Sequence, residues 1–207
     1  HSMHDLPHVA ARLYGTPLLV AKPKLDVILN IIGPRLGGAP LEDLPSLPAR
    51  DIEITENGIA VIPVVGTLVA RSSYLAAASG LTSYTEIGDT IENAATDPRV
   101  QGLLLDIDSP GGEVGGLFDL VDRIVAVREQ TGKPIWAVAN EAALSAAYAI
   151  ACAADVIAIT QTGEAGSIGV VAVHVDESNA DREKGMNWTF IQAGDKKTDG
   201  NPHAPLS

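Results

Sequence analysis

The residue of this chain best suited to catalysis is Ser145. It lies within positions 140–155, NEAALSAAYAIACAAD, where small residues follow an apolar, strand-like run. This stretch predicts a helix that another chain can approach closely, and Ser145 carries a nucleophilic hydroxyl near its start. A serine in an alanine-rich helix is more often a packing residue. Catalysis therefore needs support from other parts of the chain.

Two further stretches offer the groups that a serine nucleophile needs. A serine hydroxyl is a poor nucleophile near neutral pH, so it requires a base within hydrogen-bond reach and N–H donors for the oxyanion. The glycine turn in 106–112, DIDSPGG, could present such donors, and the segment 194–197, GDKK, offers an amine as the base. We predict that the oxyanion is bound by the N–H groups of Gly112 and Ala146.

Lysine is the predicted base, because no histidine has a recognisable triad context. Apart from His1 at the start of the chain, the histidines stand in the N-terminal arm, at a strand end and in a proline-rich tail, at His4, His8, His174 and His203. A lysine amine can act as a base when burial brings its pKa from about 10.4 down to about 7–8. We select Lys197, with Lys196 as a neighbour that stays in solvent.

The residues next to Lys197 in the sequence do not favour an uncharged lysine, so its role as a base depends on other parts of the protein. Asp195 and Asp199 favour its charged form, and this polar stretch cannot exclude water from its own lysine. The rest of the fold, or a neighbouring subunit, must therefore cover Lys197. We expect activity to depend on assembly, so a fully active monomer in dilute solution would contradict this expectation.

The glycine turn also has a simpler interpretation, a strand followed by a tight bend without any function. In the functional interpretation, Gly111 lets a substrate backbone come close, and Leu144 with the alanines around Ser145 forms a shallow apolar pocket for small or aliphatic residues. Ser109 is a rival nucleophile. It precedes a proline and has no candidate base nearby, so we expect it to be structural.

Strand and helix patterns alternate along the chain, which indicates an α/β architecture. Strands are predicted at 51–70 (broken by a hairpin at Asn57-Gly58), 100–107, 135–139, 156–160, 168–173 and 188–192, and helices at 83–95, 113–129, 140–155 and 176–184. The apolar run 100–107, VQGLLLDI, predicts a parallel strand buried on both faces. Ligands of such folds bind where strand ends meet helix starts. Gly111 and Ser145 both fall at such junctions, so we expect them to be neighbours.

The chain divides into an arm and a main domain. Residues 1–3 look like the remnant of a cleaved tag. Residues 4–50 combine two short helical patterns with a linker, 33–50, that holds four prolines and three glycines. Residues 51–207 form the α/β domain, and we expect the natural protein to continue beyond Ser207.

Composition and charge exclude several classes of function. With 26 acidic and 14 basic residues, the net charge of −12 repels nucleic acid and anionic lipid, so neither is an expected partner. No apolar run reaches the length of about eighteen residues that a membrane span needs, so we expect a soluble protein. The single cysteine, Cys152, favours a reducing compartment and is expected to be a small core residue. No metal or other cofactor is predicted.

Together these motifs resemble the signal peptide peptidase A family of serine proteases, which carry a Ser/Lys dyad on a ClpP/crotonase-like fold. The matching pieces are VIPVVGTL, the turn DSPGG, the segment ANEAALSAAY, GSIGV at 166–170 and the GDKK of 194–197. The resemblance implies that Ser145 is the nucleophile, Lys197 the general base and Ser167 the hydroxyl that orients the lysine amine.

The same resemblance places Gly112 and Ala146 in the oxyanion hole. Ala147 departs from the family, in which a glycine often stands two residues after the nucleophile.

The N-terminal arm resembles one branch of this family. Its sequence LPHVAARLYGTPLLVAKPKLDVILNIIG is similar to that of phage and prophage head proteases, which degrade scaffold and trim capsid proteins. This branch implies protein substrates, action in the bacterial host cytoplasm and the phage prohead, and a homo-oligomer. In single-domain members the lysine reaches a neighbour's serine. We expect no membrane anchor of the kind that membrane-bound signal peptide peptidases carry.

Three alternatives stay open. The first is a cytoplasmic protease similar to signal peptide peptidase A, and the second is a crotonase-type acyl-CoA enzyme, which shares the glycine turn but needs no serine nucleophile. The third is a non-catalytic capsid assembly protein with an inherited protease fold.

Overall fold

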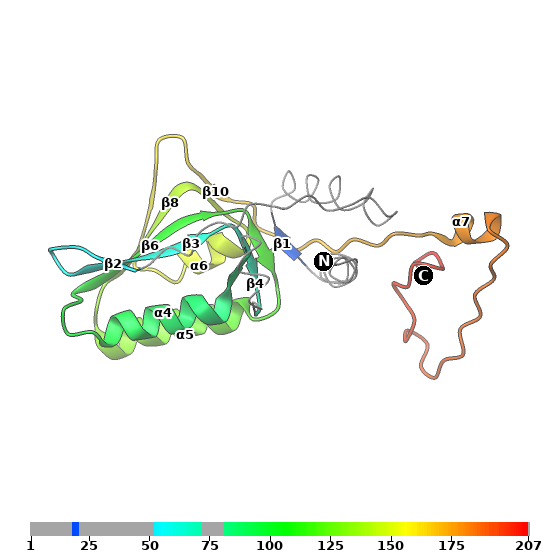
Figure 1. Cartoon of the computed structure of the whole chain (residues 1–207), viewed down its shortest axis with the longest axis horizontal. Helices are drawn as coiled ribbons and strands as arrows, with labels where there is room; N and C mark the ends of the chain where they lie inside the picture. Colours follow the sequence, from blue (N-terminus) through cyan, green and yellow to red (C-terminus); the bar gives the residue numbers. More distant parts are fainter. Residues whose placement is uncertain (1–17, 21–51, 72–80, 207) are drawn as a thin grey trace, which may run out of the picture. The chain divides into compact units, whose positions relative to one another are not determined.

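The computed structural model describes residues 18–20, 52–71 and 81–206 (Figure 1). The chain forms two compact units, one spanning Leu18–Val171 and the other including residues 172–206, and we describe each by itself. Of the predicted arm and linker, 4–50, the structure describes residues 18–20. The two helices expected in the arm, and the tag remnant 1–3, lie outside the described residues.

The larger unit is built on a six-stranded, mostly parallel sheet. Its strands are β2 (Glu53–Ile54), β3 (Ile59–Val65), β6 (Gly102–Ser109), β8 (Ile135–Leu144), β9 (Val156–Ile159) and β10 (Glu164–Gly166). They lie in the order β10-β8-β6-β3-β2, with β9 also paired with β8. The β2–β3 pair is antiparallel and the other pairs are parallel. The predicted α/β architecture is therefore confirmed.

The hairpin predicted at Asn57-Gly58 joins β2 to β3. Gly58 has a φ of +75°, and its N–H donates to the carbonyl oxygen of Thr55 at 2.9 Å. A Cβ at this position would lie 2.6 Å from the carbonyl oxygen of Arg99, so both the backbone conformation and the space require glycine.

Three helices cover one face of this sheet: α4 (Tyr84–Thr96), α5 (Leu117–Thr131) and α6 (Ala146–Ala151), with α4 and α5 side by side (Figure 1). Helix α4 agrees with the predicted 83–95. Helix α5 was predicted from residue 113 but begins at Leu117, because 111–113 form a strand and Gly116 adopts a left-handed conformation with φ +81°. It ends at Thr131, and the C-cap residue Gly132 has a φ of +64°.

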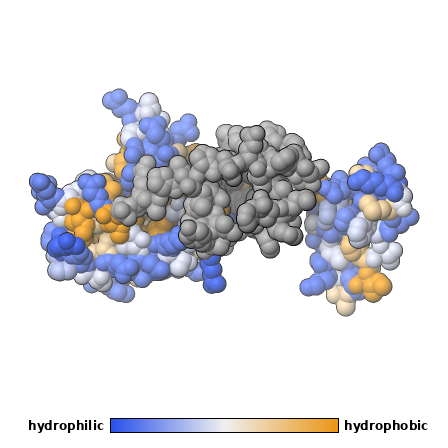
Figure 2. Space-filling model, in the orientation of Figure 1, coloured by the Kyte–Doolittle hydropathy of each residue, from blue (hydrophilic) through white to orange (hydrophobic). Residues whose placement is uncertain are grey.

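The core lies between the sheet and these helices, and the opposite face of the sheet is more open. Alternate strand residues such as Ile62, Leu105 and Ala137 are fully buried under the helices. On the other face, the strand register places Val61, Leu104, Trp136 and Val156 in one row. Leu104 is half-buried and Trp136 is 52% exposed, and hydrophobic surface is visible on this unit in Figure 2. The prediction that 100–107 is buried on both faces is wrong for this second face, which no described helix of the unit covers.

A second, smaller sheet branches from the first. It contains β1 (Leu18–Val20), β7 (Gly111–Glu113), β4 (Thr67–Val69) and β5 (Leu81–Ser83), in the order β1-β7-β4-β5. The chain enters it from β3 through Gly66, which has a φ of +77° and whose N–H donates to the carbonyl oxygen of Asp108 at 3.0 Å. It enters again from β6 through the DSPGG turn. The glycine turn thus continues as a strand.

The unit of residues 172–206 holds α7 (Ser178–Glu183), close to the predicted helix 176–184. The carboxylate of Asp181 lies 2.7 Å from Nδ1 of His203, and the His203 ring stacks on Trp188 with centroids 4.0 Å apart. His203 is thus a residue with partners inside this unit. Among the described residues, no helix is long and apolar enough to cross a membrane.

Two predicted strands are wrong. In the described structure, 168–173 shows a single bridge residue, Val171, and 188–192 forms no strand. Both stretches have apolar residues suited to a sheet, but a strand exists only where a neighbour completes its backbone hydrogen bonds. Apart from the single bridge at Val171, the described residues supply no such neighbour.

Candidate active site

Ser145 occupies the sharp turn between β8 and α6. The predicted helix 140–155 is wrong at both ends, because β8 continues to Leu144 and α6 covers Ala146–Ala151 alone. Ser145 itself has φ 57° and ψ −113°, a conformation that costs a non-glycine residue about 1–3 kcal/mol. Its N–H donates to the carbonyl oxygen of Gly166 at 2.7 Å. The strand–turn–helix geometry holds the serine at the end of the sheet, where ligands of α/β proteins bind.

The hydroxyl of Ser145 is buried and unpaired. The residue is 3% exposed, and its Oγ is the one buried side-chain polar atom of the described residues that lacks a hydrogen-bond partner. A packing serine in a helix usually bonds back to a carbonyl four residues earlier. Leaving a buried hydroxyl unpaired costs about 1–3 kcal/mol. The strain and the unpaired hydroxyl both favour a functional serine over a packing one.

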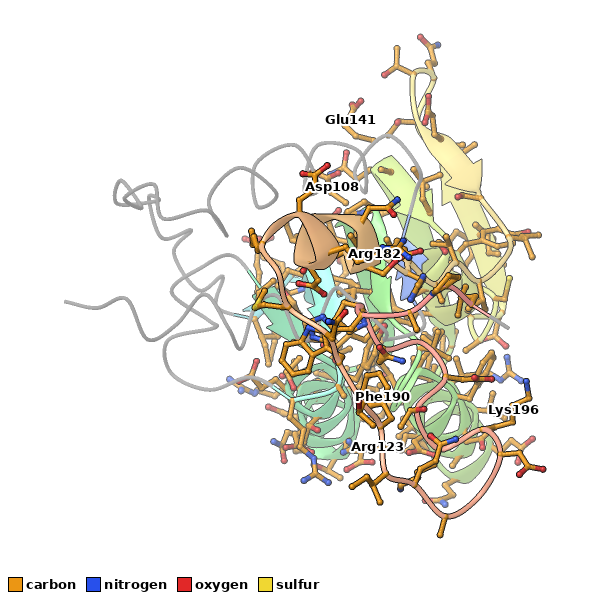
Figure 3. The ribbon with its side chains drawn as sticks, turned by 90° about the vertical axis from the view of Figure 1, so that its right-hand side faces the viewer. Asp108, Arg123, Glu141, Arg182, Phe190 and Lys196 are labelled. Atoms are coloured by element: carbon orange, nitrogen blue, oxygen red, sulfur yellow. The ribbon has the colours of Figure 1, made fainter. Side chains whose placement is uncertain are left out.

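A bulge in β8 redirects the chain just before Ser145. Ile107 pairs with Ala139 but Ser109 pairs with Ala143, so three residues of β8 stand opposite one residue of β6. Glu141, within the bulge, has a φ of +81°. Figure 3 labels Glu141 together with Asp108, which stands opposite the bulge on β6. Bulges bend strands and re-aim side chains next to active sites.

The same register confirms that the glycine turn and the serine turn are neighbours. Ser109 pairs with Ala143, two residues before Ser145, and α6 contacts β7. The hydroxyl of Ser109 donates to the carbonyl oxygen of Gly66 at 2.7 Å and accepts from the N–H of Gly111 at 3.1 Å. Ser109 is therefore the structural residue that the sequence indicated.

Gly112 is required by its packing against β4. A Cβ on Gly112 would lie 1.8 Å from the carbonyl oxygen of Leu68 and 2.7 Å from its nitrogen. Gly111, which has a φ of +97°, makes the bend that precedes it. Packing and backbone conformation thus account for glycine at both positions without any catalytic role. Strand β7, which contains Gly112, contacts α6, which begins at Ala146, and the oxyanion role of these two residues stays a prediction.

Two residues that the sequence did not flag hold β7 in place. The hydroxyl of Tyr84, a residue that is 2% exposed, donates to the carbonyl oxygen of Glu113 at 2.6 Å. The Glu113 carboxylate accepts from the N–H of Ala70 at 2.8 Å. Burial, and then the charge of Glu113, raise the pKa of Tyr84 well above its ordinary value. No local pattern in the sequence points to this contact, which joins residues far apart in the chain.

The GSIGV segment also reaches the serine turn. Strand β10 runs parallel to the end of β8, with Gly166 opposite Leu144. Ser167 follows with a φ of +55° and is exposed. Leu144, the predicted pocket residue, is half-buried. The orienting role of Ser167 and the pocket role of Leu144 stay predictions.

The two lysines belong to the other unit. Lys196 is 70% exposed on its side chain and forms an ion pair with Asp199 at 3.1 Å, so it stays in solvent. Lys197 is exposed within that unit, and its N–H donates to the carbonyl oxygen of Gly194 at 3.2 Å. The pairing of Lys197 with Ser145 stays a prediction.

The described residues contain no group of three or more histidine, cysteine or acidic side chains placed to hold a metal ion. Cys152 is exposed at the end of α6, so the expectation of a core position is wrong. Cys152 is the C-cap residue of α6, and its neighbours Ala151 and Ala153 take the core positions instead.

A strained, buried serine at a strand–helix junction of an α/β fold is the arrangement found in serine hydrolases. Residues 127–207, which include Ser145, Ser167 and Lys197, match Peptidase family S49. Capsid assembly protease C of Escherichia phage lambda is 38% identical to the chain, and the match covers 99% of the chain and 51% of that protein. Over residues 127–207 the chain is similar to peptidase family S49, and over nearly its whole length it is similar to a phage capsid assembly protease, as the resemblance implied. Its mostly parallel α/β sheet with flanking helices agrees with the expected fold class.

The chain is also similar to two further proteins. Head-tail preconnector protein GP5 of Enterobacteria phage P21 is 38% identical, and the match covers 98% of the chain and 44% of that protein. The solved structure of the 1510-N membrane-bound stomatin-specific protease, a mutant in complex with a substrate peptide, is 18% identical, with a TM-score of 0.42 and coverage of 60% of this chain and 55% of that one. The chain spans about half the length of the curated relatives it matches.

Proposed function

We propose that this chain is a serine endopeptidase that uses a Ser/Lys dyad and cleaves capsid or scaffold proteins during phage head maturation. The observation that carries the proposal is the Ser145 hydroxyl, which is buried, unpaired and held on a strained turn. The names of the phage relatives support the substrate class. Action in the bacterial host cytoplasm and the prohead, without a nucleic-acid or membrane partner, belongs to the same proposal.

In the proposed mechanism, Oγ of Ser145 attacks the carbonyl carbon of the scissile peptide bond while the uncharged amine of Lys197 takes the hydroxyl proton. The N–H groups of Gly112 and Ala146 bind the oxyanion that forms. The lysine then gives its proton to the departing amine, and an acyl-enzyme remains on Ser145. Water, deprotonated by the same lysine, hydrolyses this ester and restores the serine. Ser167 holds the amine in place.

Assembly is part of this proposal, because Lys197 must lose contact with water. Lys197 is exposed in its own unit and has Asp195 and Asp199 beside it. The other unit carries exposed apolar side chains on β8 and β9, including Trp136 and Ile159, each 52% exposed. Surfaces of this kind often mark contacts between proteins. We propose that a homo-oligomer covers the site and that Lys197 serves either its own serine or a neighbour's.

Three variants test the proposal: Ser145→Ala, Lys197→Ala and Lys196→Ala. Each is co-expressed with a scaffold protein, processing is followed by mass spectrometry, and oligomer size is measured. We expect the first two to abolish processing and Lys196→Ala, the matched control, to keep it. Unchanged processing after Lys197→Ala would favour a non-catalytic assembly protein. Acyl-CoA turnover that survives Ser145→Ala would favour the crotonase alternative.

A further inference from the structure

Strand β1 pairs with the strand that carries the glycines of the site. The pairing is antiparallel, with Leu18 opposite Glu113, Leu19 opposite Gly112 and Val20 opposite Gly111. On its other edge, β7 is paired with β4 through Leu68 and Gly112. Both edges of β7 are therefore occupied by strands of this chain.

This pairing matters because β7 is where a substrate carbonyl would have to arrive. Strand β7 contains Gly112, and α6, which contacts β7, begins at Ala146. A peptide whose carbonyl oxygen reaches both N–H groups must run along β7. Proteins commonly bind extended peptides by adding them as a strand to a sheet edge. Since β4 holds one edge of β7, the peptide has to use the edge that β1 takes.

We propose that Leu18–Val20 is an internal strand that closes the peptide-binding edge of β7, so that the protease is autoinhibited until a substrate strand replaces it. The inference rests on the proposed function and adds its regulation. It commits to an extended aliphatic peptide as the competing ligand, because the internal strand is Leu-Leu-Val.

The features of β1 are those of a replaceable strand. It is three residues long and stands at the end of its sheet, in the order β1-β7-β4-β5. Pro17 precedes it in the sequence and has no N–H to lengthen the ladder. A substrate segment that forms more backbone hydrogen bonds than three residues can form would displace it. Until then, the fraction of molecules with a free edge sets the apparent affinity for substrate.

The first test weakens the internal strand and leaves the proposed catalytic residues intact. Successive residues of a strand direct their N–H groups to opposite edges, so Leu19→Pro/Val20→Pro removes one donor to β7 whichever of the two supplies it. The matched control, Leu19→Ala/Val20→Ala, keeps both N–H groups. Casein is the probe substrate, and circular dichroism checks that both variants fold.

We expect the proline variant to cleave casein with an apparent KM about five- to thirtyfold lower than the parent, at unchanged kcat, and the alanine control to move less. An unchanged KM in a proline variant that still cleaves casein would overturn the autoinhibition and leave the proposed function standing. Cleavage of the parent chain within 18–20 would also overturn it, because β1 would then be a substrate.

A second measurement does not depend on turnover. In the Ser145→Ala protein, amide hydrogen exchange is followed with and without a synthetic peptide of residues 15–22, GTPLLVAK. We expect the amides of 18–20 to lose protection when the peptide is added, while those of 111–113 stay protected. Protection of 18–20 that persists at saturating peptide would overturn the inference, even if no variant cleaves casein and the proposed function fails.

Discussion

The contact between Gly112 and Leu68 allows the sharpest prediction on stability. A Cβ at residue 112 would lie 1.8 Å from the carbonyl oxygen of Leu68 and 2.5 Å from its carbonyl carbon. These are backbone atoms of β4, so the clash cannot be relieved by a side-chain rotation. Gly112→Ala must push β7 away from β4. We expect a loss of about 3 kcal/mol, the upper part of the range for overpacking.

Gly115→Ala is the matched control, because a Cβ there meets nothing within 4 Å. For a chain of this size, 1 kcal/mol shifts Tm by about 2–4 °C. Calorimetry of the full chain should therefore show a Tm about 6–12 °C lower for Gly112→Ala, and an unchanged or slightly higher Tm for Gly115→Ala. Equal Tm values for the two variants would refute the steric role of Gly112.

Three other predictions follow from the described contacts. Ser145→Ala removes the unpaired buried hydroxyl, so it should raise the free energy of unfolding by about 1 kcal/mol in urea titrations and abolish cleavage. A lower free energy of unfolding would contradict the conclusion that the Ser145 hydroxyl is unpaired. Tyr84→Phe should lower the free energy of unfolding by about 1–2 kcal/mol. Burial and the charge of Glu113 raise the pKa of Tyr84 above its ordinary 10.0. The stability that the Tyr84 hydroxyl contributes is therefore complete below pH 10.0 and is lost as the pH rises further. Tyr84→Phe should accordingly lose less stability than the parent between pH 9 and about 11. Hydrogen bonds from Arg99 lower the pKa of Asp97 to about 2. The stability that ionised Asp97 contributes is therefore present above the ordinary pKa of 3.8 and disappears as the pH falls through about 2. In an NMR titration of Arg99→Gln, the pKa of Asp97 should lie closer to 3.8 than in the parent.

The sequence allowed the main sheet, its helices and the junction of Ser145 to be predicted, because each rests on a local pattern. The β2–β3 hairpin followed from Asn57-Gly58, and α4 from apolar residues at helical spacing. The closeness of Gly111 and Ser145 followed from the topology of α/β proteins, in which strand ends meet at one edge.

The rest of the site depends on contacts between distant residues. Strands β1, β4, β5 and β7 have three residues each, too few for a periodic signal. The contact of Tyr84 with Glu113 spans two elements and leaves no mark in either local sequence. The strained φ of Ser145 results from the bulge and turn around it rather than from its own preference. Where strands were predicted from apolar residues at 188–192, the described residues offer no neighbour to pair with.

The central claim is that Ser145 is a nucleophile activated by Lys197. Labelling with a fluorophosphonate, located by peptide mass spectrometry and followed in time, tests it without knowledge of the substrate. We predict one labelled residue, Ser145, in the parent chain and in Lys196→Ala, with labelling slowed at least about a hundredfold in Lys197→Ala, as loss of a general base predicts. Equal labelling rates in Lys197→Ala and the parent, or label on Ser109 or Ser167 instead of Ser145, would contradict the claim.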